Sequence, residues 1–292
     1  MRARILSPRD LPLLSEFSWV DPSKRPYRDG DVVYAPVMEG EAYDTVVPER
    51  KRRGRGYQRL GDTIIFHGKR PTATEIDDLG SCEDPSCILF IPAHTGSLRT
   101  PSCEVIAGIP HEVLHRECGI AYHLDPTKVM FSQGNRGEKE RIRSLISSSG
   151  REERIADMFA GIGYFSLPAA VGGGSVHAME LNPDSYGYLL KNIRENDLMH
   201  RITADCGDCR DLLSGRYNRV IMGHFDAADY LEDLFPHVGS GSIIHLHTLK
   251  PDEKSILTLF SEYGITVADI TVHRIKKYAP RIWHSVMDLV IG

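Results

Sequence analysis

The two halves of the chain differ in how apolar and polar positions follow one another. Apolar residues alternate with polar ones over 31–67, and β-like runs occur at 32–37, 63–67, 87–91, 104–106 and 113–115. Alternation with a period of two is typical of half-buried strands, and helical periodicity is weak before about Lys139. The first half is therefore expected to be a small β-rich α+β domain.

In the second half, segments of strand and helix character alternate. We expect strands at 154–158, 175–180, 201–204, 219–222, 241–247, 266–274 and 283–291, and helices at 164–171, 184–196, 228–235 and 251–263. This rhythm predicts an α/β fold with a doubly wound, mostly parallel sheet, to which the last two strands add an antiparallel hairpin at an edge. The polar joint Ser147–Gly150 precedes the first strand, so the predicted domains are 1–146 and 147–292.

A glycine-rich turn follows the first strand of the second half. Asp157 ends that strand, and Gly161 and Gly163 come before a helix. Glycine tolerates dihedral angles that a Cβ forbids, and the amides that open a helix favour an electron-rich group. The dinucleotide motif needs a third glycine, and the phosphate-binding loop ends in Gly-Lys-Ser/Thr; the chain has neither at this place. The turn therefore predicts a nucleotide pocket of another kind.

Acidic residues follow the next two strands. Glu180 ends the second strand, where its carboxylate can accept both hydrogen bonds of a ribose diol, and Asp208 follows the third, where it can bind the amino group of an adenine. An adenosine without a pyrophosphate fits these features, and S-adenosylmethionine is the usual such cofactor. A glycine turn that closes an ordinary strand–helix joint is the plainer alternative. We expect Phe159 and Gly161 to shape the pocket floor and Cys209 to frame the adenine beside Asp208.

Composition narrows the class of protein. The chain has 292 residues, and 41% of them are hydrophobic, which suits a globular protein of two domains with a real core. It has no run of about 18 apolar residues and no secretory signal, so we expect a cytoplasmic protein without a membrane span. The net charge of −5 argues against a bulk cationic nucleic-acid binder, although local patches can still bind phosphate.

The cysteines are expected to be reduced thiols. Cys206 and Cys209 have the C-x-x-C spacing of a zinc knuckle or a redox pair. A tetrahedral zinc would need a second pair, and Cys82 and Cys87 are separated by four residues instead of two. We predict no metal.

Basic residues gather in two places, the glycine-broken run 50–59 and the segment 273–278. A solvated loop is the plain interpretation of the first. The functional one is a phosphate clamp in which arginine and lysine neutralise a backbone. Two basic segments on an acidic protein favour a docked polyanion, and RNA is the economical hypothesis. The residues expected to contact it are Arg52, Arg53, Arg55, Lys276 and Lys277.

Specific motifs occur in a fixed order along the chain, at 61–68, 115–119, 128–132, 138–143, 157–165, 180–183 and 277–284. In combination they resemble the archaeal enzymes that modify purine 37 of tRNA, and the resemblance covers nearly the whole chain from about residue 28. It implies a Rossmann-like class I S-adenosylmethionine-dependent transferase domain. Two branches share the layout: the guanosine-37 N1-methyltransferases, and the wyosine-pathway transferases that move the 3-amino-3-carboxypropyl group of S-adenosylmethionine.

Two differences favour the wyosine-pathway branch. After the fourth strand the methyltransferase branch has a loop that resembles the pattern Asn/Asp-Pro-Pro-aromatic, whereas this chain has Gly-His-Phe-Asp at 223–226. Before a helix they resemble Phe-Ser-Pro-Arg, whose arginine helps neutralise the guanine oxygen, whereas this chain has Phe131-Ser132-Gln133-Gly134. The resemblance thus implies transfer to C7 of 4-demethylwyosine at position 37 of tRNA-Phe, with release of methylthioadenosine. A tRNA guanosine-37 N1-methyltransferase and a non-catalytic protein that binds S-adenosylmethionine and RNA remain alternatives.

The resemblance also implies roles for single residues. Ser132 and Lys139 would reach into the cofactor site, with Lys139 as a cation for the methionyl carboxylate; a solvated helix charge is the plain alternative. His224 lies in the loop after the fourth strand, where it would relay a proton from the target base or hold that base by a hydrogen bond, unless it is structural. The expected partner is the anticodon loop of tRNA-Phe, bound by a monomer.

Overall fold

The structure is a computed structural model that describes residues 2–22, 24, 26–29, 32–47, 56–96 and 98–292. The chain forms two compact units, Met1–Gly56 and Tyr57–Gly292. The predicted boundary at 146/147 falls inside the second unit, in the last turn of a helix. The division into an RNA-recognition domain, 1–146, and a cofactor-binding transferase domain, 147–292, stays a prediction. Among the described residues, no helix is long and apolar enough to span a bilayer.

The first unit contains a small antiparallel sheet. Its strands are β1 (Arg2–Leu6), β2 (Tyr27–Asp29), β3 (Val32–Pro36) and β4 (Thr45–Val46), in the order β2-β3-β1-β4, and the 3-10 helix η1 (Pro8–Glu16) follows β1. Val33 and Ala35 are fully buried and Val32 and Tyr34 are less so, which fits the strand predicted here. The guanidinium of Arg4 lies 4.4 Å from the ring centroid of Trp19.

The second unit begins with two smaller sheets. The first comprises β5 (Gln58–Leu60), β6 (Thr63–His67), β7 (Cys87–Thr95) and β8 (Thr100–Gly108) in chain order, and the second is the hairpin of β9 (Val113–Glu117) and β10 (Ile120–Leu124). β6 and β7 are parallel and are joined through helix α1 (Ala73–Cys82). The strands predicted from 63 to 115 are confirmed. The sequence did not predict α1, whose apolar stripe, Ile76 and Leu79, is short.

A seven-stranded sheet forms the rest of the unit. Its order is β13-β12-β11-β14-β15-β17-β16, with parallel pairing from β13 to β15. The last two strands pair antiparallel, so the predicted edge hairpin is confirmed. The strands are β11 (Arg154–Asp157), β12 (Ser175–Glu180), β13 (Ile202–Cys206), β14 (Arg219–Met222), β15 (Ile243–Thr248), β16 (Val267–Ala279) and β17 (Ile282–Ile291).

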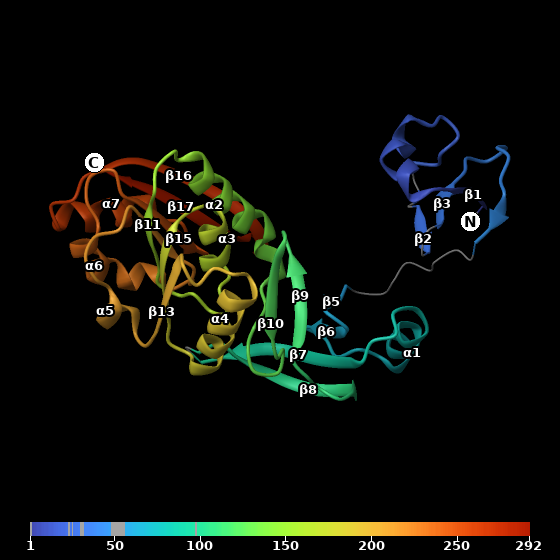
Figure 1. Cartoon of the computed structure of the whole chain (residues 1–292), viewed down its shortest axis with the longest axis horizontal. Coiled ribbons are helices and arrows are strands. Elements are labelled where there is room, and N and C mark those ends of the chain that lie inside the picture. Colours follow the sequence, from blue (N-terminus) through green and yellow to red (C-terminus); the bar gives the residue numbers. More distant parts are fainter. Residues whose placement is uncertain (1, 23, 25, 30–31, 48–55, 97) are drawn as a thin grey trace. The chain divides into compact units, whose positions relative to one another are not determined.

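Helices cover both faces of this sheet (Figure 1). One face packs on α2 (Arg136–Ser148), α3 (Ser166–Val171) and α4 (Pro183–Glu195), and the other on α5 (Cys209–Leu212), α6 (Leu231–Leu234) and α7 (Glu253–Glu262). Ile155 joins the first core and its neighbour Ala156 the second, because successive strand residues point to opposite faces. Short 3-10 turns, η2 (Gln133–Asn135), η3 (Ala227–Tyr230) and η4 (Phe235–His237), complete the unit.

Candidate active site

A cavity of about 260 Å³ lies at the carboxyl ends of β11, β12, β13 and β14. The strand order reverses between β11 and β14, and in open α/β sheets ligands bind at such a switch point. Most of the residues that the sequence singles out for the cofactor or for catalysis line this cavity: Ser132, Phe159, Gly161, Glu180, Asp208, Cys209 and His224. Lys276, predicted to contact RNA, lines it too.

The glycine turn after β11 is held in a form that needs glycine. Gly161 and Gly163 have φ of 57° and 101°, in the region that side chains disfavour. A Cβ on Gly161 would also lie 2.5 Å from the ring of Tyr164. Gly161 lines the cavity, so the turn places backbone at the cavity wall.

Glu180 is fixed by the backbone on both sides. Its Oε2 accepts a hydrogen bond from the Gly161 amide at 2.7 Å, and Oε1 accepts one from the Asn182 amide at 2.7 Å. Burial raises the pKa of Glu180, while these amides stabilise the carboxylate. Each oxygen keeps a lone pair for a ligand, so the arrangement can accept the hydrogen bonds of a ribose diol.

Asp208 and Cys209 stand at the next strand end. Asp208 caps α5 and pairs with Arg210, whose Nη2 lies 2.6 Å from Oδ2, and hydrogen bonding to Arg210 lowers the pKa of Asp208. Burial raises the pKa of Cys209 to about 12, so its thiol stays neutral. Cys206, the other half of the C-x-x-C pair, is exposed. In the part of the chain that the structure describes, no three His, Cys, Asp or Glu side chains are grouped to hold a metal.

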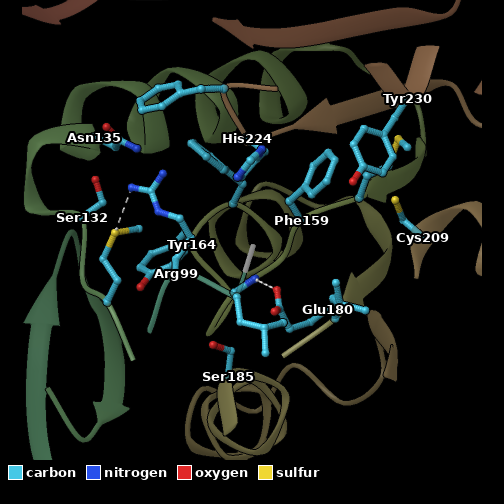
Figure 2. Close-up of a pocket in the computed structure, with 18 of the residues that line it drawn as sticks. Arg99, Ser132, Asn135, Phe159, Tyr164, Glu180, Ser185, Cys209, His224 and Tyr230 are labelled. Atoms are coloured by element: carbon cyan, nitrogen blue, oxygen red, sulfur yellow. Dashed lines mark hydrogen bonds between the residues drawn. The ribbon is translucent and has the colours of Figure 1, made fainter. Parts of the chain in front are cut away.

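The other side of the cavity is basic. Figure 2 shows Arg99 and Ser132 across the cavity from Glu180 and Cys209. Lys276, from β16, donates from Nζ to the Ser132 hydroxyl at 3.2 Å. The cavity is thus polarised, with carboxylates at one end and cations at the other.

Lys139 lies elsewhere, and its predicted role is corrected. Its side chain is only 2% exposed, and Nζ donates to Oε1 of Glu117 at 2.8 Å. The ammonium also lies over the rings of Tyr122, Phe131 and Tyr164. Burial lowers the pKa of Lys139, and its hydrogen bond to Glu117 acts in the opposite direction. Because this buried cation already has a carboxylate partner and does not line the cavity, it is neither the expected ligand for a methionyl carboxylate nor a solvated charge.

His224 lies beside Phe159, with ring centroids 5.5 Å apart. Its Nδ1 accepts a hydrogen bond from the Asp226 amide at 3.2 Å. Burial lowers the pKa of His224, which favours the neutral ring. A neutral imidazole that accepts at Nδ1 carries its proton on Nε2. His224 is therefore arranged to donate a hydrogen bond at Nε2 and not to take a proton there.

A second histidine, His284 on β17, also lines the cavity. Its Nε2 lies 2.9 Å from Nδ1 of the buried His247. Among the described residues, His284 Nδ1 has no hydrogen-bond partner. Burial lowers the pKa of His284 to about 4, and Lys276 acts in the same direction. Burial and the positive charge of Lys276 both favour the neutral ring, and Nδ1 is enclosed by protein, so the ring must shift for this nitrogen to reach a ligand.

The remaining expectations divide as follows. Lys277 is exposed on β16 and does not line the cavity. Arg52, Arg53 and Arg55 lie outside the described residues. Sequence reasoning gave no role to Arg99 or His284. His284 is the last residue of the motif 277–284, and this motif could have identified it as a site residue. Arg99 lies between β7 and β8 and belongs to no motif, so the sequence does not identify it.

An ionisable carboxylate on β12, a glycine turn after β11 and a cationic far end suit a nucleoside that carries an amino acid chain. The fold and the site therefore define the class of protein, an S-adenosylmethionine-dependent transferase with a Rossmann-like sheet.

Comparison with known proteins gives the family. Residues 113–268 match the family model of the TRM5/TYW2 methyltransferase domain. The chain is 35% identical over 248 residues to the tRNA(Phe) (4-demethylwyosine(37)-C(7)) aminocarboxypropyltransferase of Methanocaldococcus jannaschii, a match that covers 80% of this chain and 96% of the relative. The chain belongs to the TRM5/TYW2 family.

Solved structures agree. The crystal structure of M. jannaschii TYW2 in complex with AdoMet matches with a TM-score of 0.64 and 31% identity, over 81% of this chain and 99% of that one. Trm5b from Pyrococcus abyssi matches with a TM-score of 0.72 over 99% of both chains. Its identity of 24% shows a shared fold.

Proposed function

We propose that this chain transfers the 3-amino-3-carboxypropyl group of S-adenosylmethionine to C7 of 4-demethylwyosine at position 37 of tRNA-Phe, bound through its anticodon loop by a cytoplasmic monomer. The name of the M. jannaschii relative supports the activity, since this chain spans nearly all of that protein.

The loop after β14 is the observation that carries the proposal. The methyltransferases resemble Asn/Asp-Pro-Pro-aromatic at this loop, which holds the target nitrogen and guides its proton, whereas this loop presents His224, arranged to donate from Nε2. A hydrogen-bond donor such as His224 suits a nucleobase that reacts at a carbon atom. It can bind a carbonyl oxygen or ring nitrogen of that nucleobase and does not need to remove a proton from it.

The reaction forms one C–C bond and then requires removal of one proton from C7. S-adenosylmethionine supplies the electrophilic γ-carbon and is released as methylthioadenosine, so one C–C bond forms as one C–S bond breaks. C7 must then lose its hydrogen as a proton. We assign the acceptor as Nδ1 of His284, which becomes an imidazolium that donates from Nε2 to His247. A weak base suffices, because a protonated carbon of this kind is a strong acid.

Labelled cofactor tests the proposal. The protein is incubated with precursor tRNA-Phe and S-adenosylmethionine labelled either on the methyl group or on the carboxylate. Carboxylate label should enter the RNA, and methyl label should appear in methylthioadenosine.

Methyl label in the RNA would instead identify a guanosine-37 N1-methyltransferase. Cofactor that stays intact with both precursor and unmodified tRNA-Phe would identify a non-catalytic binding protein.

A further inference from the structure

Two cations line the cavity without an acidic partner. Among the described residues, neither Arg99 nor Lys276 lies within salt-bridge distance of a carboxylate, whereas Lys139 is paired with Glu117. Burial lowers the pKa of Lys276, and the charges of Lys139 and Arg99 add to this. Like charges gathered in a half-buried place indicate that an anion belongs between them.

Arg99 is held in place with its donors free. Its Nη2 contacts only the Met130 sulfur, at 3.6 Å, and its guanidinium carbon lies 5.9 Å from the ring centroid of Phe225. The Nε atom is buried and has no hydrogen-bond partner in the described part of the chain. Because Nε is covered by protein, a ligand in the cavity would be bound by the terminal guanidinium nitrogens, which have no carboxylate partner among the described residues.

Gly134 makes the room that Lys276 occupies. A Cβ on this glycine would lie 2.7 Å from Cδ and 2.8 Å from Nζ of Lys276. Any other residue at 134 would therefore displace the ammonium from its position beside Ser132. The atoms in question belong to the flexible end of a side chain, so such a substitution would move Lys276 with little strain on the fold.

We infer that Lys276 and Arg99 bind the carboxylate of the cofactor's amino acid chain, and that Gly134 is a specificity-determining residue because it admits Lys276. Glu180 takes the ribose at the other end of the cavity. The inference rests on the S-adenosylmethionine site and not on which group is transferred, so it survives if the chain proves to be a methyltransferase.

An RNA phosphate is the competing anion for Lys276. The structure favours the cofactor, because Lys276 is half-buried, bonded to Ser132 and turned into the cavity, whereas its exposed neighbour Lys277 does not line it. A surface phosphate would be expected to use the exposed lysine.

The test compares ligands that differ in the carboxylate. Calorimetry measures the affinities of S-adenosylmethionine, of decarboxylated S-adenosylmethionine and of methylthioadenosine for the whole protein. Lys276→Gln should weaken S-adenosylmethionine about tenfold, since a charged hydrogen bond is lost, and should change the other two by less than about twofold. Gly134→Ala should weaken the same ligand in the same selective way. Unchanged methylthioadenosine binding shows that the variants are folded.

Lys277→Gln is the matched control for cofactor binding, because it removes the same charge one residue away and outside the cavity, and it should alter none of the three ligand affinities measured by calorimetry. Equal losses for S-adenosylmethionine and its decarboxylated form in Lys276→Gln would overturn the inference, since the carboxylate would then not be what Lys276 binds. Weaker tRNA binding with unchanged cofactor affinity would also overturn it and assign Lys276 to an RNA phosphate.

Discussion

At the scale of single residues, Glu180 shows how a buried carboxylate is prepared for a ligand. Burial works against its charge, and the Gly161 and Asn182 amides work for it. The cost of burial is thus offset by backbone that the glycine turn supplies, and the site exists before the ligand arrives.

Glu180→Gln should weaken S-adenosylmethionine binding by about 1–3 kcal/mol, because the amide replaces an acceptor next to two N–H donors. Calorimetry at neutral pH measures this, with Asp184→Asn, an exposed acid on α4, as the control. In the unaltered protein the affinity should fall with pH sooner than for an ordinary glutamate, because the raised pKa lets Glu180 protonate at higher pH. The same affinity in the Gln variant would refute the ribose assignment.

His284→Phe should lower kcat by about 10²-fold, the size expected for loss of a general base, while S-adenosylmethionine affinity stays the same. His200→Asn is the control, since that histidine is exposed and does not line the cavity. Steady-state rates with precursor tRNA measure both. A wild-type kcat in the His284 variant would show that another group accepts the C7 proton, which would contradict the assignment of His284.

The sequence could predict Gly161, Glu180 and Asp208 as lining residues, because each lies at or shortly after the end of its own strand and the order of strands fixes where these ends meet. It could not predict the surroundings of Lys139. Glu117 and Tyr164 reach this lysine from segments far away in the chain, and only packing reveals that its charge is already paired.

At the scale of elements, Asp288 ties the edge hairpin to the sheet and to α2. Arg141 donates to its carboxylate at 2.5 and 3.0 Å, and His245 and His273 lie 2.6 and 3.1 Å away. Burial alone would raise the pKa of Asp288, but hydrogen bonds from His245 and Arg141 outweigh it and hold the pKa well below its usual range. Since β16 carries Lys276, this network also helps to place a cavity residue.

Asp288→Asn should lower the free energy of unfolding by about 1–2 kcal/mol, because it removes one of the two carboxylate partners of Arg141, the other being Glu138. A depressed carboxylate pKa stabilises the fold at pH above the unfolded value, so the difference from wild type should be full at neutral pH. It should shrink as the pH falls below about 4. Urea unfolding measures it, with the exposed Asp269→Asn on β16 as control. A constant difference down to low pH would contradict the assigned pKa.

Strands were more predictable than helices in the first 150 residues. Ile64, Ile65 and Phe66 form a short continuous apolar run, which is typical of a strand buried on both faces. Helix α1 has few apolar positions and is stabilised by packing on that same sheet. In the second half the periodic segments are longer, and nearly all strand and helix positions were correct to within a few residues.

At the scale of the whole molecule, a protein of net charge −5 must bind a polyanion through local basic segments. Replacing Arg52, Arg53 and Arg55 together with glutamine should reduce the slope of log affinity for tRNA against log salt by about 2–3, if each arginine neutralises one phosphate. Arg70→Gln is a control, because Arg70 is already paired with Glu104. Measurements of tRNA binding at several salt concentrations give the slope. An unchanged slope would contradict a phosphate-binding role for the segment 50–59 and would favour its interpretation as a solvated loop.

The most direct test of the central claim is the mass of the modified nucleoside. Precursor tRNA-Phe carrying 4-demethylwyosine is incubated with the protein and S-adenosylmethionine, digested, and analysed by mass spectrometry. The account predicts a nucleoside heavier by one 3-amino-3-carboxypropyl group, with fragments that place it on the tricyclic base. A nucleoside heavier by a single methyl group would contradict it.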